Sequence, residues 1–133
     1  MQTTTLGLTV RLNTDFETAQ ARVAEALKGE GFGILTEIDV QATFKKKLDV
    51  DFRPYKILGA CNPTLAHRAL TTTPEAGLLL PCNVTLSQLE DSVEVSIIDP
   101  LVMLGVADHA DLLPVAEEAR ARLSRVVAVL AAN

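Results

Sequence analysis

The strongest constraint on the fold is a stretch between residues 84 and 97 in which apolar and polar side chains alternate on both sides of a polar turn at residues 90–92. A period of two residues places every second side chain on the same side of a sheet. The stretch therefore predicts a β-hairpin with one buried side. Its inward-facing positions are Val84, Leu86, Val93, Val95 and Ile97.

Further strands are predicted where β-branched and apolar residues gather. They fall at residues 4–12, 32–38 and 55–61. The run of three leucines at residues 78–80 predicts a strand buried on both sides, which Pro81 would interrupt at a bulge or at an edge of the sheet.

Helices are predicted between these strands from helical spacing and from capping residues. The expected starts lie after Asn13 or Thr14, after Asp39, at Asn62 with Pro63, and after Asp111, and a helical turn is expected at 101–104. Gly31 is well suited to end the first helix in a left-handed conformation. The short second helix would bury Val40, Phe44 and Leu48.

The order of these segments predicts one α+β domain over residues 1–133. It would have two layers, a mixed β-sheet of about five strands and helices packed on the sheet, in the order β-α-β-α-β-α-β-β-α. The first β-α-β segment suggests a right-handed crossover. A chain of 133 residues is long enough to bury a stable core without disulfides or metals.

The core must be aliphatic, because aromatic residues make up only 4% of the chain while hydrophobic residues make up 48%. A slight apolar surplus of this kind is easily placed in a subunit interface, so we expect a homodimer. The last helix carries an apolar stripe that suits either packing on the sheet or a dimer contact. The stripe consists of Leu112, Ala116, Ala119, Leu123, Val126 and Leu130.

The charge of the chain argues against several partners. A net charge of −5 and a pI near 4.9 disfavour nucleic-acid binding, and the basic run at 45–47 is expected to be a solvated helix face. The apolar stretch at 126–132 is too short to span a membrane. Without a signal peptide, the two cysteines are expected to be reduced thiols, which places the protein in the cytoplasm.

The segment in which chemistry is expected is the strand-to-helix corner Cys61-Asn62-Pro63. Unpaired amides at a helix N-terminus would lower the pKa of the Cys61 thiol, or hold a carboxylate or phosphate of a ligand. A buried cysteine next to a capping asparagine is the structural alternative. Gly59 would leave a gap on one side of the strand. With the ends of neighbouring strands included, the predicted ligand-binding residues are Glu37, Cys61, Asn62 and Asn83.

The second cysteine, Cys82, is expected to point into the core. If the strands that carry the two cysteines are neighbours, Cys61, His67 and Cys82 would offer the three ligands of a catalytic zinc site. Their spacing matches no established pattern, and a surface position explains His67 equally well. No motif identifies a cofactor, because glycine-rich phosphate loops, paired-cysteine redox motifs and nucleophile elbows are absent from the sequence.

Residues 14–107 resemble the bacterial branch of the family catalogued as domain of unknown function 302. The resemblance lies in residues 31–39 (GFGILTEID), 55–63 (YKILGACNP), 79–84 (LLPCNV) and 98–100 (IDP). It implies an α+β fold and a dimer, with no assigned activity. The asparagine-proline and leucine-proline steps belong to the family pattern and the cysteines to its narrower branch, whereas His67 belongs to neither.

Three functions follow as hypotheses. The first is a dimeric small-molecule-binding domain with its pocket at the Cys61-Asn62-Pro63 corner. The second is an enzyme that uses Cys61 as a thiolate or as a metal ligand. The third is an interaction module whose partner docks on the sheet edge near Pro81.

Overall fold

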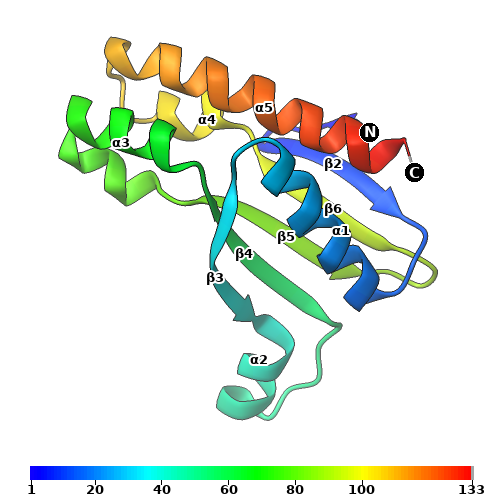
Figure 1. Cartoon of the computed structure of the whole chain (residues 1–133). Helices are drawn as coiled ribbons and strands as arrows, with labels where there is room; N and C mark the ends of the chain where they lie inside the picture. The colour runs from blue at the N-terminus through cyan, green and yellow to red at the C-terminus, as the bar shows by residue number, and fades with distance from the viewer. Residues whose placement is uncertain (133) are drawn as a thin grey trace.

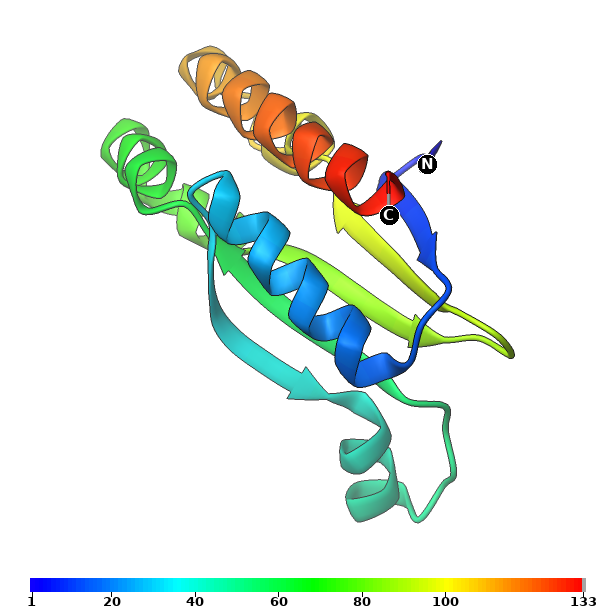
Figure 2. The ribbon, with the colours of Figure 1, turned by 45° about the vertical axis from the view of Figure 1, so that its right-hand side comes forward.

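A computed structural model describes residues 1–132 and contains one sheet, with the long helices α1 (Phe16–Gly29) and α5 (Leu113–Ala131) side by side on one of its faces (Figures 1 and 2). The sheet order is β1-β2-β6-β5-β4-β3. The strands are β1 (Gln2–Thr3), β2 (Gly7–Leu12), β3 (Gly33–Asp39), β4 (Tyr55–Cys61), β5 (Cys82–Gln88) and β6 (Val93–Ile98).

The α+β class is confirmed, and the sheet differs in two details from the expectation. It has six strands rather than about five, because the expected first strand is split by a turn between Thr4 and Gly7. All its pairings are antiparallel rather than mixed. Strands β2 and β3, which flank α1, run in the same direction, but three other strands lie between them, so they never pair.

The core lies between the sheet and the helices, as the alternating hairpin predicts. All five inward-facing positions of that hairpin are at most 1% exposed. The stripe on α5 is buried against α1, α4 (Pro100–Gly105) and β2. The core interpretation of this stripe is therefore confirmed, and its interpretation as a dimer contact is wrong.

The predicted strand at 78–80 is wrong. Residues Pro74–Leu79 form a 3₁₀ helix, and Leu78 is 82% exposed. Pro74 presets a helical φ at the start of this segment, and the strand ladder begins only after Pro81, where Cys82 pairs with Ala60. Pro81, whose peptide bond with Leu80 is cis, thus precedes a central strand and lies neither in a bulge nor at a sheet edge.

Two of the predicted caps are also wrong. Helix α1 is capped by Asp15, whose Oδ1 accepts a 2.8 Å hydrogen bond from the Thr18 amide, rather than by Asn13 or Thr14. Asp111 lies within the 3₁₀ turn Ala110–Leu112 that precedes α5, and no side chain caps α5 itself. The predicted Asp39 cap and the left-handed Gly31, with φ of 85°, are confirmed.

Helix α2 (Val40–Leu48) projects from the end of the sheet, away from the other helices (Figures 1 and 2). The prediction that its apolar positions are buried is wrong, because no residue of the helix is buried. Phe44 instead packs edge-on against Phe52 of the following loop, with ring centroids 5.1 Å apart. The element therefore makes its own small apolar contact outside the main core.

No helix within residues 1–132 combines the length and the apolar character needed to cross a membrane.

Candidate functional site

The corner at Asn62 joins the end of β4 to the start of α3 (Pro63–Thr72). Asn62 is 9% exposed, and its Oδ1 accepts a 3.2 Å hydrogen bond from the Leu65 amide, which confirms the predicted cap. The Ala66 amide donates to the Asn62 carbonyl at 2.9 Å, and Pro63 has no amide hydrogen. Since the chain itself uses these donors, the helix start has little capacity left for an anionic ligand.

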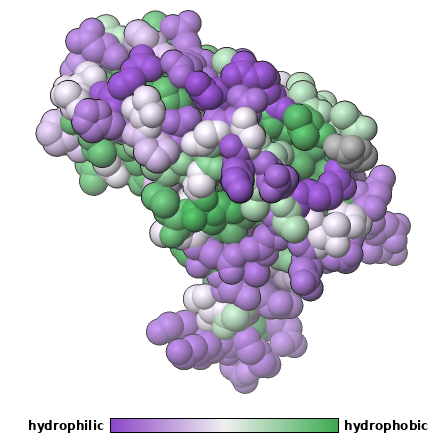
Figure 3. All heavy atoms as spheres, in the orientation of Figure 1, coloured by the Kyte–Doolittle hydropathy of each residue, from purple (hydrophilic) through white to green (hydrophobic). Residues whose placement is uncertain are grey.

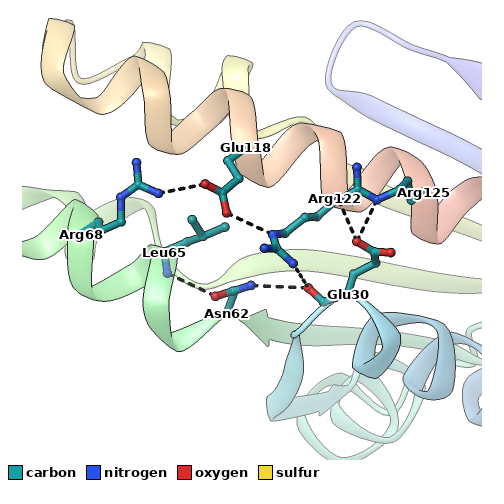
Figure 4. A network of polar contacts seen from close by, with 7 residues as sticks. All are labelled: Glu30, Asn62, Leu65, Arg68, Glu118, Arg122 and Arg125. Carbon is teal, nitrogen blue, oxygen red and sulfur yellow. Dashed lines mark hydrogen bonds and ion pairs between the residues drawn. The ribbon is translucent and has the colours of Figure 1, made fainter.

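A polar network surrounds the corner on the side of α5 (Figure 4). The Asn62 Nδ2 donates to the Glu30 carbonyl at 3.5 Å, and an Arg122 guanidinium nitrogen donates to the same carbonyl at 3.2 Å. A Cβ placed on Gly31 would lie 3.0 Å from the Asn62 Nδ2. The end of α1 is therefore held directly against the start of α3.

The same network continues along α5 through Glu118. This carboxylate accepts hydrogen bonds from Arg68 of α3 at 3.0 Å and from Arg122 at 3.2 Å. These bonds, with the Arg68 bond the larger cause, lower the pKa of Glu118. On the α1 side, Arg125 pairs with the Glu30 carboxylate at 2.9 Å. Three helices are thereby tied together next to Asn62.

On its other side, the corner faces a cavity of about 30 Å³, which we call the corner cavity. This volume has room for roughly two water-sized groups. Its walls come from Phe32 before β3, from β4, α3, α4 and α5, and from residues 80–82 at the start of β5, and they are apolar apart from Asn62 and the thiols. Among the lining residues are Cys61, Leu65, Leu80, Cys82, Met103 and Val115.

Both thiols of the corner cavity are protonated at neutral pH. Burial raises the pKa of the half-buried Cys61, so the predicted lowering of that pKa is wrong. Burial first, and the charge of Cys61 second, raise the pKa of Cys82 to about 11. The lowering fails because the Asn62 side chain occupies the nearby amide and the thiol is partly removed from water.

The structure brings together only part of the predicted site. Cys61 and Asn62 line the corner cavity, and the strand that ends at Cys61 pairs with the strand that begins at Cys82, which meets the condition set for the two cysteines to lie close together. Glu37 is exposed on β3, where it accepts hydrogen bonds from Gln20 and from Lys56. Asn83 lines a separate shallow groove on the uncovered side of the sheet, together with residues such as Tyr55, Thr85 and Ser96.

The three proposed metal ligands do not form a cluster. Within residues 1–132, no three side chains of His, Cys, Asp or Glu are grouped so as to hold a metal ion. Cys61 and Cys82 line the corner cavity, but His67 is exposed on α3 and is not among the residues that line it. The gap predicted beside Gly59 is also filled, since a Cβ there would lie 2.7 Å from Pro81 Cγ.

Sequence reasoning missed the contributions of later segments to this site. Met103 and Val115 carry no chemical signature, and only the packing of α4 and α5 brings them to the cavity. Glu118 and Arg122 did offer a signal, because a glutamate four residues before an arginine is the favourable orientation of a helical ion pair.

Comparisons with known proteins agree on the fold and name no activity. The family model described as "Domain of unknown function DUF302" matches residues 8–130. No curated protein matches the sequence. The chain is similar to the crystal structure of an uncharacterized conserved protein DUF302 from Bacillus stearothermophilus, with 29% identity and a TM-score of 0.84. That match covers 92% of this chain and 96% of the other.

Proposed function

We propose that this chain, which belongs to the DUF302 family of domains of unknown function, is a non-enzymatic domain that binds the apolar end of a small ligand in the corner cavity. The observation that carries the proposal is the apolar cavity that Cys61 and Asn62 help to line. Concave apolar sites with few polar groups are the usual form of small-molecule sites.

The size and lining of the cavity define the ligand chemistry. A volume of about 30 Å³ admits only a short aliphatic end, so the rest of the ligand would lie at the mouth. Several lining residues are only partly buried and indicate where the cavity opens. They are Cys61, Ala66, Leu80, Pro81 and Met103.

Two features favour binding over catalysis. The thiols are neutral at pH 7, so neither is an activated nucleophile. The network around Asn62 also fixes α1, α3 and α5 relative to one another before any ligand arrives. A site held in one conformation loses less entropy when it binds a ligand.

The test is a methyl NMR titration with 1-butanol as the probe. We expect saturable shifts at the methyl groups of Leu65, Leu104 and Val115, which line the cavity. The variant Ala66→Leu, which adds a side chain at the mouth, should abolish these shifts. The matched control Ala128→Leu lies at an exposed helical position and should retain them. Unsaturable shifts, or shifts that persist in Ala66→Leu, would count against the proposal.

A thiol-dependent enzyme is the second candidate, because Cys61 and Cys82 line the same cavity. The rate of alkylation of Cys61 by iodoacetamide distinguishes the two functions. Binding without catalysis predicts that the rate keeps rising with pH and reaches its plateau only above the pKa of an ordinary thiol. A rate that is already maximal at neutral pH would favour the enzyme.

The proposal further includes a homodimer in the cytoplasm. Free thiols at positions 61 and 82 are the form that a reducing compartment maintains.

A further inference from the structure

Residues 40–54, which comprise α2 and the loop to β4, form an arm that projects from the sheet and contacts the body of the domain mainly at β4 and at Gln88, whose amide donates to the Pro54 carbonyl. The arm stands clear of the body in the space-filling view, and its visible side is mostly hydrophilic (Figure 3). Leu48 is 65% exposed and Val50 47% exposed. A helix of nine residues is only marginally stable without a surface to pack on. The arm is therefore suited to pack against a second surface.

The charges of the arm indicate that the surface it packs against is acidic. Lys45, Lys46 and Lys47 are consecutive and exposed in a chain of net charge −5. Lys45 pairs with Asp49 and Asp51 of the same arm. Within residues 1–132, Lys46 and Lys47 form no ion pair, so their charges are available to an acidic surface.

A complementary acidic surface lies at the same end of the sheet. The turn between β5 and β6 carries the exposed Glu90 and Asp91, which form no ion pair within the described part of the chain. Tyr55, where the arm returns to the sheet, pairs with Ser87 just before this turn. The basic arm and the acidic turn thus extend from one end of the molecule, on neighbouring pairs of strands.

We propose that the arm binds a second copy of this chain, with Lys46 and Lys47 of each copy against Glu90 and Asp91 of the other. A two-fold axis between the arm and the turn exchanges their positions, so both contacts form together, as an isologous interface requires. Leu48 and Val50 are buried in the same contact. The inference names a surface for the proposed homodimer and is independent of the corner cavity.

Charge reversal tests the proposal on the full chain by sedimentation velocity. The wild type is expected to be a dimer. The double variants Lys46→Glu/Lys47→Glu and Glu90→Lys/Asp91→Lys should each raise the dissociation constant by about tenfold or more, since like charges then meet. The control Glu75→Lys lies on the 3₁₀ helix 74–79 and should leave the constant unchanged. Far-UV circular dichroism checks that each variant is folded.

Mixing the two double variants gives the decisive result. In a mixed pair, the acidic arm meets the basic turn and the basic arm meets the acidic turn, so the dimer should form again. A wild-type dimer that both reversals leave unchanged, or reversed variants that stay monomeric when mixed, would overturn this interface. A monomeric wild type would overturn the dimer altogether, while the butanol titration would still report on the cavity.

Discussion

At the scale of single residues, the corner depends on backbone positions with little tolerance. Gly31 has a positive φ of 85° and lies directly against Asn62, so it combines a conformational requirement with a steric one. Both residues were predicted from the sequence, because a left-handed glycine after a helix and an asparagine before proline are local signals.

Replacing Gly31 by alanine should destabilise the fold. The left-handed conformation and the 3.0 Å approach of the new Cβ to the Asn62 Nδ2 together should lower the free energy of unfolding by about 1–3 kcal/mol. Urea denaturation measures the change. Gly33→Ala is the matched control, because nothing lies within 4 Å of its Cβ position and it should not lower stability. Equal losses in both variants would contradict the role of Gly31.

The thiol of Cys82 should make the protein less stable at high pH. Its pKa rises to about 11 on folding, so the unfolded thiol loses its proton first. The contribution of the protonated Cys82 to the free energy of unfolding is complete below pH 9. It is lost as the pH rises from 9 through 11, which lowers the free energy of unfolding by roughly 2–3 kcal/mol. Urea denaturation at several pH values measures it, with Cys82→Ala as the comparison. A wild type whose alkaline loss equals that of Cys82→Ala would refute this linkage.

The pKa of Cys61 shows why residue chemistry is harder to predict than residue geometry. The sequence places the thiol next to a helix start, but the shift depends on which atoms bind the amides and on how much water the neighbours remove. Asn62 binds the nearby amide, and α4 and α5 help to enclose the thiol, so the raised pKa follows from contacts that are distant in sequence.

At the scale of elements, the local sequence pattern predicted where most helices and strands lie, but it predicted less well what each of them packs against. The hairpin and α5 were predicted because alternation and helical spacing extend over many residues. The strand at 78–80 failed because three leucines without periodicity fit a helical turn as well as a strand. The predicted burial of the apolar side chains of α2 failed because their spacing does not reveal whether another surface lies near enough to cover them.

The same substitution, leucine to alanine, should affect stability differently in the buried helix α5 and in the exposed helix α2. Leu123→Ala on α5 should cost about 2–5 kcal/mol of unfolding free energy, because Leu123 is fully buried in the core. Leu48→Ala on α2 should change the folding stability of the monomer by less than about 0.5 kcal/mol, because Leu48 is 65% exposed. Denaturation at low protein concentration measures both. A large loss for Leu48→Ala would contradict the assignment of the arm to the surface.

At the scale of the whole molecule, the sheet order could not be predicted. Strand β2 pairs with β6, about 85 residues later in the sequence, and no local pattern specifies such a pairing. The corner cavity depends on that order, because its walls come from six separate segments. The site could therefore be predicted as a corner with a capped helix, but its apolar character could not.

The cavity and the arm lie at opposite ends of β4. The cavity adjoins Cys61 and the arm adjoins Tyr55, which places them about 20 Å apart. We therefore expect the Lys46→Glu/Lys47→Glu variant to bind 1-butanol as the wild type does, with the same methyl shifts. A changed titration in this variant would show that the two sites are coupled.

A crystal structure of the protein soaked in 1-butanol tests the central claim most directly, because it locates the probe. The account predicts electron density for the alkyl end between Cys61, Leu65 and Met103, with the hydroxyl directed toward the mouth. Butanol bound elsewhere on the molecule, with the corner cavity closed by its own side chains, would contradict it.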